Sequence, residues 1–416
     1  MVRKSRRPGK TALAFRNIRY AHADRFGPAE VLRLEGAEAD GRPGPIAPQL
    51  PSRLAIALGP QEHRAQSEDC QVVSVFTPGC SGDRPVLVWF HGGALITGGG
   101  ELSWYDGTRL ASEQDIVVVA VTYRLGVFGN YYDRRLTGPS PATTDQLAAI
   151  EWVQRNIARF GGDPQRITVA GQSAGALSIE VMLRWGVGPP VVGAIFQSGN
   201  LRDPSITYTR EASIEHSASF AELLGGEDPR TLSVKELLRY QAQFIETNGV
   251  TWGPARPDVE LPLTLPILGG WNADDDLPFT LLSRGLSSPT WRDRELLDHQ
   301  VQADTNLLYV APTVAALREA HSNNACTWAY EFRWSVPGSP WGTPHCMELP
   351  FLFGDHDAWR EAPMLAGASP DILEPVGLRM RAAWAQFVRT SEPGPGWTEW
   401  TARDPSINQL PDSLDF

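Results

Sequence analysis

Short apolar runs recur along the first half of the chain, and most of them are apolar almost throughout instead of alternating with polar residues. Runs of this kind are typical of strands that are buried on both faces of a sheet. We therefore predict strands at residues 70–76 (CQVVSVF), 85–90 (PVLVWF), 115–123 (DIVVVAVTY), 166–170 (RITVA) and 191–196 (VVGAIF). Two later runs, at residues 262–272 and 327–334, predict further strands.

Segments with helical spacing separate these runs. Residues 143–160 follow a Thr/Asp start signal and repeat apolar side chains three or four positions apart, at Leu147, Ile150, Val153 and Ile157. Further helices are predicted at residues 176–185 and 376–388, the second followed by a Pro/Gly-rich tail. Strand and helix in alternation predict an α/β fold, with a mostly parallel central sheet and helices on both faces. In such sheets, ligands bind beyond the carboxyl ends of the strands.

The length of 416 residues and the hydrophobic content of 42% are sufficient for one large domain with a packed core. We expect residues 1–14 to be a disordered tail and residues 15–416 to form a single domain. Two mixed regions, at about residues 210–257 and 277–325, interrupt the strand pattern.

The formal net charge of −11 argues against nucleic acid or an anionic membrane as the main partner and favours a small or neutral substrate. The apolar runs are far shorter than the roughly 20 residues of a membrane-spanning helix. Arg16 and Arg19 interrupt the N-terminal segment before an export signal develops. The four cysteines have neither a CxxC pair nor metal-ligand spacing, which indicates reduced thiols. We therefore expect a cytoplasmic protein without a metal site.

The stretch FGGDPQRITVAGQSAGALS contains the pattern Gly-x-Ser-x-Gly at GQSAG. This pattern can mark a nucleophilic serine at a sharp turn between a strand and a helix. A strand is predicted before it and a helix after it, and Gly171, Ala174 and Gly175 leave little side-chain bulk in the turn. The alternative is a glycine-rich turn whose serine is inert. We predict that Ser173 is a nucleophile.

A serine hydroxyl needs a base to remove its proton, and a histidine base needs a carboxylate that fixes its tautomer and stabilises its cation. On α/β sheets of this kind the chain order is Ser, then Asp or Glu, then His. The histidines that follow Ser173 are His216, His299, His321, His345 and His356.

The sequence resembles the type-B carboxylesterases, the α/β-hydrolase family that includes bacterial para-nitrobenzyl esterases, fungal lipases and cholinesterases. FGGDPQRITVAGQSAG matches the family's serine signature throughout, and SEDCQVVSVFTP is similar to its Glu-Asp-Cys-Leu signature. HGG at residues 91–93 and WAQFVRTSEPGPGW near the end also agree, so the resemblance runs from about Phe15 to Trp400. It implies an α/β-hydrolase fold and a serine carboxylesterase that hydrolyses carboxylic esters through an acyl-enzyme, without a metal or cofactor.

The resemblance also implies a base and an acid for Ser173. The family's histidine motif is similar to PHCMELPFLFG, which puts the base at His345. Aligning GWNADDDLPF on Asn272 and Phe279 puts the triad acid at Asp275. The neighbouring carboxylates remain alternatives for the acid, namely Asp274 and Asp276.

By the same resemblance, the oxyanion hole consists of the backbone N–H groups of Gly92, Gly93 and Ala174. Ser198, in FQSGN, resembles a family serine that hydrogen-bonds near the triad acid. For four aromatic residues, the lining of an acyl or alcohol pocket is the alternative to packing in the core, which we favour, and none is assigned a catalytic role, namely Trp104, Tyr105, Trp252 and Trp341.

The chain departs from the family at several points. Gln71 stands where leucine is usual, and Cys346 replaces a small residue after the histidine. The spacings from serine to acid and from acid to histidine are shorter than in typical members, so we expect a shortened helical cover, at about residues 210–257 and 277–325, and a more open site. On the same triad, the alternatives are a lipase, an amidase or an acyltransferase. From another class, the alternative is a catalytically silent binding protein on the same scaffold, although such proteins typically lose triad residues.

Overall fold

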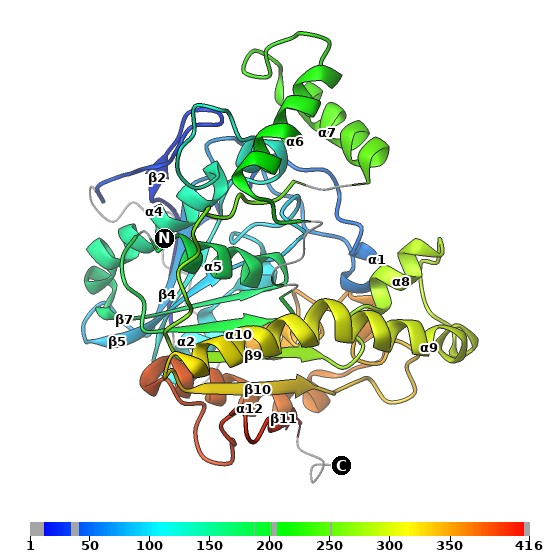
Figure 1. The fold of residues 1–416 in the computed structure, drawn as a ribbon. Helices are drawn as coiled ribbons and strands as arrows, with labels where there is room; N and C mark the ends of the chain where they lie inside the picture. The colour runs from blue at the N-terminus through cyan, green and yellow to red at the C-terminus, as the bar shows by residue number, and fades with distance from the viewer. Residues whose placement is uncertain are drawn as a thin grey trace.

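The computed structural model describes residues 12–34, 41–186, 188–199, 201, 206–249 and 252–411. In these ranges a nine-stranded sheet has the order β1-β4-β6-β5-β7-β8-β9-β10-β11 (Figure 1). Strand β4 pairs antiparallel with β1 and β6, and every other neighbouring pair is parallel. The strands are β1 (Leu13–Arg19), β4 (Val72–Thr77), β5 (Arg84–Phe90), β6 (Val117–Val121), β7 (Gly162–Gln172), β8 (Gly193–Gln197), β9 (Ile267–Asn272), β10 (Thr327–Phe332) and β11 (Ile407–Leu410).

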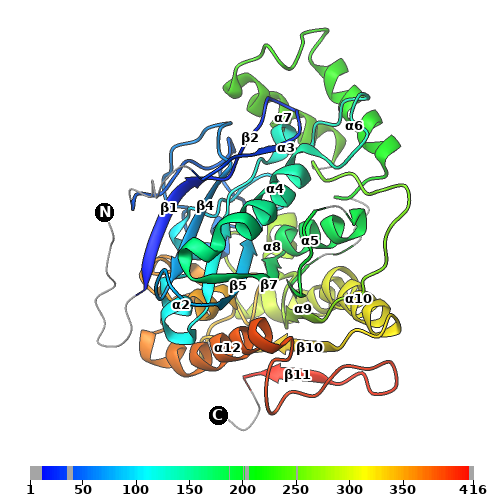
Figure 2. The same cartoon turned by 90° about the vertical axis from the view of Figure 1, so that its left-hand side faces the viewer.

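Helices cover both faces of this sheet, because alternate strand residues point into two separate apolar clusters. One cluster packs against α2 (Thr108–Gln114), α11 (Leu349–Phe353) and α12 (Pro370–Thr390). The other packs against α4 (Pro141–Asn156), α5 (Ala174–Trp185) and α10 (Ala311–Ser322), as Figure 2 shows from the side. The predicted α/β fold with a mostly parallel sheet is confirmed.

The remaining elements are short or lie at the periphery of the sheet. Strands β2 (Ala21–His22) and β3 (Glu30–Val31) form a separate pair. The other helices are α1 (Ala55–Leu58), α3 (Gly126–Asn130), α6 (Arg210–Leu223), α7 (Val234–Asn248), α8 (Leu277–Ser283) and α9 (Trp291–Thr305). Four short turns of 3₁₀ or π type are η1 (Ser103–Tyr105), η2 (Ile157–Phe160), η3 (Asn306–Val310) and η4 (Pro363–Leu365). None of the described helices is both long and apolar enough to span a lipid bilayer.

The strand order changes direction between β5 and β7. From β5 the chain moves to β6 on one side and then returns to place β7 on the other side of β5. A crevice forms beyond the carboxyl ends of strands where the order reverses in this way. The loop after β5 and the turn after β7 are the HGG and GQSAG segments, so the fold brings both motifs to the same place.

The seven predicted strands all exist, with ends that differ by a few residues. Strand β11 was not predicted, since we expected only a Pro/Gly-rich tail there. Helix α12 begins at Pro370 and contains Pro375, so the predicted start at residue 376 was wrong. Strand β1 begins at Leu13, two residues inside the expected tail; residues 1–11 of that tail lie outside the described residues.

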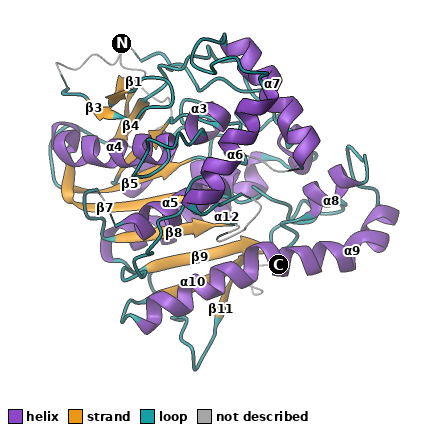
Figure 3. Cartoon of the chain, turned by 45° about the horizontal axis from the view of Figure 1, so that its top comes forward, coloured by secondary structure: helices purple, strands orange, loops and turns teal. Residues whose placement is uncertain are grey.

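The two predicted cover regions are helical. Helices α6 and α7 lie in the upper half of Figure 3 and share a small apolar cluster with α3. A capping box joins Ser233 and Glu236 at the start of α7, and another joins Thr290 and Asp293 at the start of α9. Helix α10, also within the second region, packs directly on the sheet. Only the rest of residues 277–325 is therefore available to cover a site.

The departure at Gln71 has a structural consequence. This side chain is 1% exposed, and neither its amide nitrogen nor its amide oxygen finds a hydrogen-bond partner among the described residues. A leucine would bury no polar atom there. An unpaired buried polar group costs about 1–3 kcal/mol, so Gln71 lowers the stability of the fold.

Candidate active site

Ser173 lies at the junction of β7 and α5 in a strained backbone conformation. Its φ of 56° and ψ of −125° lie outside the regions that residues with a side chain prefer. Its N–H donates to the carbonyl of Gln197 on the neighbouring strand β8 at 2.8 Å, which fixes the turn. The side chain is half-buried. Ser173 therefore stands at the carboxyl end of the sheet, as the strand-to-helix turn predicted.

Small residues are required in this turn by close backbone contacts. A Cβ atom on Gly175 would lie 2.1 Å from the carbonyl oxygen of Phe90, and one on Gly171 would lie 2.6 Å from the carbonyl carbon of Gly175. Both separations are far below van der Waals contact. Glycine at these positions lets α5 start directly against β5.

The HGG loop lies against Ser173. A Cβ atom on Gly92 would be 3.0 Å from the Cβ atom of Ser173. His91 is buried, which lowers its pKa to about 4, and its Nδ1–H donates to the carbonyl of Gly92 at 2.7 Å. Because the C=O and N–H of a trans peptide point in opposite directions, this bond directs the N–H of Gly93 away from His91. His91 thus orients the loop and remains neutral.

His345 and Asp275 form a buried pair. Nδ1 of His345 lies 2.7 Å from Oδ1 of Asp275, and both side chains have no exposed area. The second oxygen of Asp275 accepts a hydrogen bond from the N–H of Asn272 at 2.8 Å. The rings of Phe279 and Tyr309 lie 5.2 Å and 5.3 Å from the imidazole. These contacts fix the orientation of the imidazole and leave Nε2 as its remaining nitrogen.

The two neighbouring aspartates have other partners. Asp274 forms an ion pair with Arg294 at 2.8 Å and accepts a hydrogen bond from the N–H of Thr343 at 2.8 Å. Asp276 accepts a hydrogen bond from the hydroxyl of Thr280 at 2.7 Å. Among the three carboxylates, only Asp275 contacts His345.

Two residues near this pair differ from expectation. The hydroxyl of Ser198 is buried and has no hydrogen-bond partner among the described residues, so the bond expected near the acid is not made there. Glu348 is buried as well, and burial together with Asp275 raises its pKa. It accepts hydrogen bonds from Asn272 at 2.6 Å and Gln197 at 3.2 Å. The histidine motif contained Glu348, but the sequence analysis gave it no role.

The sequence analysis also missed Gln172. Its Nε2 lies 3.0 Å from Nε2 of His345, and both side chains are 1% exposed. No hydrogen bond joins Ser173 to His345 among the described residues. In enzymes without substrate, catalytic hydrogen bonds are often long or poorly aligned. The only sequence signal for this contact is the position of Gln172 inside the GQSAG motif, directly before Ser173.

The other sequence-named residues lie elsewhere. His216, His299 and His321 are on the helices α6, α9 and α10. His356 lies in the loop after α11, where its side chain is 11% exposed and lies 3.7 Å from a carboxylate oxygen of Glu374. The aromatic residues interpreted as core are all buried, namely Trp104, Tyr105, Trp252 and Trp341.

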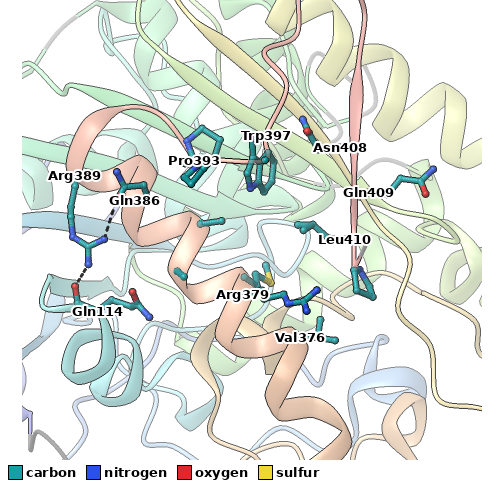
Figure 4. Close-up of a pocket in the computed structure, with 17 residues that line it drawn as sticks. Gln114, Val376, Arg379, Gln386, Arg389, Pro393, Trp397, Asn408, Gln409 and Leu410 are labelled. Atoms are coloured by element: carbon teal, nitrogen blue, oxygen red, sulfur yellow. Dashed lines mark hydrogen bonds between the residues drawn. The ribbon is translucent and has the colours of Figure 1, made fainter. Parts of the chain in front are cut away.

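A cavity of about 480 Å³ lies away from these residues, between α12 and β11 (Figure 4). Trp397, Leu410 and Arg379 are among its lining residues, and none of the residues named above at the serine turn or the histidine pair lines it. Across the described ranges, no group of three or more His, Cys, Asp and Glu side chains is arranged to hold a metal ion.

Comparisons with known proteins relate this arrangement to a family. The model of the Carboxylesterase family matches residues 2–254. The probable N-octanoylanthranilate hydrolase AqdA2 of Rhodococcus erythropolis is 34% identical over 92% of this chain and 90% of its own length. The para-nitrobenzyl esterase of Bacillus subtilis (strain 168) is 31% identical over 86% of this chain and 81% of its own length.

Solved structures give the same relation. A thermophilic PNB esterase superposes with a TM-score of 0.82 and 27% identity, over 98% of this chain and 93% of that one. The carboxylesterase Est55 of Geobacillus stearothermophilus superposes with a TM-score of 0.77 and 26% identity, over 98% of this chain and 94% of that one. The chain therefore belongs to the carboxylesterase family and is a serine esterase of the α/β-hydrolase fold, which hydrolyses carboxylic esters of small molecules.

Proposed function

We propose that Ser173, His345 and Asp275 are the catalytic triad of this esterase. The observation that carries the proposal is the buried 2.7 Å contact between Nδ1 of His345 and Oδ1 of Asp275, at the edge of the sheet where the turn of Ser173 also lies. An ionised Asp275 accepts the Nδ1–H of His345 and leaves Nε2 as the proton acceptor. The three residues also follow one another in the order expected for this fold.

In the proposed mechanism, the hydroxyl oxygen of Ser173 attacks the ester carbonyl while His345 takes its proton. Asp275 stabilises the resulting imidazolium. The alcohol then leaves with the proton from His345, and an acyl group remains on Ser173. Water enters, gives a proton to His345 and hydrolyses the acyl-enzyme by the same route.

Negative charge develops on the carbonyl oxygen during both steps, and backbone N–H groups are the donors proposed to hold it. Ala174 is the first residue of α5, so its N–H has no partner within the helix. Gly92 and Gly93 supply the other donors from the loop that lies against Ser173. Ser198 supports the site through its backbone, since its N–H donates to the carbonyl of Gly270 at 2.8 Å.

The wider assignments remain proposals too. Residues 15–416 act as one catalytic domain, with the regions at about 210–257 and 277–325 as its cover. A cytoplasmic location and the lack of a nucleic-acid or membrane partner follow from the charge of −11 and the cysteine pattern.

For substrates, the relatives' names mention N-octanoylanthranilate and para-nitrobenzyl compounds. We therefore propose a small ester that carries an aromatic ring.

The test is Ser173→Ala with a short-chain nitrophenyl ester as substrate. Loss of the nucleophile should lower kcat by at least about a thousandfold, with the thermal unfolding curve unchanged. The matched control is Ser178→Ala, one turn along α5, where the hydroxyl donates to the carbonyl of Ala174. Turnover of the Ser173→Ala variant at the wild-type rate would exclude the proposed triad.

A further inference from the structure

The base nitrogen of the proposed triad already has a hydrogen-bond partner. Nε2 of His345 lies 3.0 Å from Nε2 of Gln172, the residue directly before Ser173. Nδ1 of the same ring lies 2.7 Å from Asp275. Because all three side chains are almost completely buried, water does not compete for these contacts.

The protonation of the ring follows from its two partners. A carboxylate accepts but does not donate, so Asp275 fixes the proton of the neutral imidazole on Nδ1. Nε2 then carries the lone pair, and the amide N–H of Gln172 donates to it. That lone pair is also the one that must accept the proton of Ser173. Two consecutive residues of the chain therefore compete for one acceptor.

The side chain of Gln172 has little room to leave this position. A Cβ atom on Gly92 would lie 2.7 Å from Oε1 of Gln172, so the carboxamide packs against the HGG loop. The side chain of Gln172 also lies beside the thiol of Cys346, the residue after His345. Cys346 has a φ of 70°, in the left-handed region where glycine is usual, which brings its side chain into this contact. The carboxamide is thus clamped between the HGG loop and the histidine loop.

We propose that Gln172 is a positioning residue that holds Nε2 of His345 in the enzyme without substrate by donating an N–H to its lone pair. The inference rests on the proposed triad. Donation by Gln172 stabilises the neutral imidazole, which is the form that acts as the base. When Ser173 approaches Nε2, Gln172 releases the nitrogen.

Other charged or titratable groups also surround His345. Asp275 and Asp276 lie in the turn after β9, Glu348 lies directly before α11, and Asp304 near the end of α9 acts on Asp276. Tyr309 on η3 and the buried thiol of Cys346 complete the set. Of these groups only the thiol of Cys346 also contacts Gln172, and burial raises the pKa of that thiol so far that it stays neutral in the assay. A shift of the pH profile in a Gln172 variant therefore reports the contact at Nε2.

The experiment compares Gln172→Met and Gln172→Glu with the wild type, using kcat/KM against pH for a neutral nitrophenyl ester. Methionine keeps the length of the side chain and removes the donor, so the acid limb should move up by about half to one pH unit, the size expected for one neutral hydrogen bond. Glutamate places a negative charge beside the imidazolium and should move the limb further in the same direction. The matched control is Gln165→Met, an exposed glutamine on the same strand, which should leave the limb unchanged.

An acid limb at the wild-type pH in Gln172→Met overturns the proposal. Where Gln172→Met does not fold, Gln172→Glu decides alone, and an unshifted or lowered limb overturns the proposal. Ser173→Ala is measured in parallel to separate the two claims. An inactive Ser173→Ala with an unshifted Gln172→Met removes only the role of Gln172, whereas an active Ser173→Ala removes the triad on which it rests.

Discussion

Three consecutive aspartates follow β9, and their partners separate them although their chemistry is the same. The sequence favoured Asp275 only through its distance of four positions from Phe279. It could not exclude Asp274 or Asp276, because any of the three carboxylates can accept a bond from an imidazole. The turn decides, since it directs Asp274 to Arg294, Asp276 to Thr280, and only Asp275 to His345.

Replacing each aspartate in turn should rank the three by their contact with His345. Asp275→Asn removes the acceptor of Nδ1–H and should lower kcat by about ten thousandfold. Asp276→Asn keeps the bond from Thr280 and should lower kcat by less than about tenfold. Asp274→Asn should act mainly on stability, through the ion pair with Arg294. The measurement is kcat on one nitrophenyl ester, and Asp275→Asn as the mildest of the three would refute the assignment.

Asp276 also gives a prediction for stability against pH. Burial and the neighbouring Asp304 raise its pKa to about 6 in the folded protein, whereas an unfolded aspartate has a pKa of about 3.9. The folded state therefore binds this proton more tightly. The stability from this group is fully present below about pH 4 and is lost as the pH rises through 6.

Asp276→Asn should remove this loss of stability at higher pH, because asparagine does not ionise. The free energy of unfolding is measured in urea at about pH 4.5 and at about pH 7.5. Relative to the wild type, the variant should be more stable at the higher pH than at the lower pH, by up to about 2 kcal/mol. The control is Asp357→Asn, whose side chain is 85% exposed and should give the same difference at both pH values. An equal free-energy difference for Asp276→Asn at both pH values would contradict a raised pKa.

At the scale of elements, the strands that are buried on both faces could be predicted because their apolar runs are continuous. The four-residue β11 could not be predicted, because its residues alternate between exposed and half-buried and it pairs with β10 at the edge of the sheet. The π-type turn η3 was also missed. Pro312 follows it at the start of α10 and has no N–H to give, which disturbs the hydrogen-bond ladder there. Tyr309, which lies beside His345, belongs to this turn.

The close contact between β5 and α5 predicts that one added methyl group at Gly175 has a large effect on stability. Gly175→Ala places a Cβ atom 2.1 Å from the carbonyl oxygen of Phe90, so α5 must move away from β5. We expect a loss of about 3 kcal/mol in the free energy of unfolding and a displaced Ser173, with a lower kcat. The control is Gly79→Ala, where an added Cβ has no neighbour within 4 Å. Wild-type stability of Gly175→Ala in urea would show that the turn is not tight.

At the scale of the whole molecule, the sequence predicted which regions are helical but not how their helices pack. Helices α6 and α7 share an apolar cluster with α3, and Gln241 of α7 accepts a hydrogen bond from the N–H of Val127 at 2.7 Å. Helix α10 instead covers the sheet, although it lies in the second predicted cover region. The apolar content of these helices is similar, so only tertiary packing separates their roles.

A buried ion network holds distant segments to the helix that follows Ser173. Arg184 on α5 is 1% exposed and donates to Glu180 at 2.7 Å, to Glu319 on α10 at 2.7 Å and to the carbonyl of Leu261 at 3.1 Å. Arg184→Met should lower the free energy of unfolding by about 3 kcal/mol, because Glu180 and Glu319 each lose a positively charged partner in a largely buried network. The control is Arg360→Met, whose pair with Asp357 is exposed and should change stability by less than about 1 kcal/mol. If Arg184→Met and Arg360→Met changed the free energy of unfolding in urea equally, the buried network would not contribute more to stability than an exposed pair.

Covalent labelling of the nucleophile tests the proposed triad at Ser173. The enzyme is treated with a fluorophosphonate, which reacts with a serine only when a base activates it. Peptide mass spectrometry should place the adduct on Ser173, with much slower labelling in His345→Ala and no labelling of that peptide in Ser173→Ala. An adduct on another residue, or unchanged labelling of Ser173→Ala, would contradict the account.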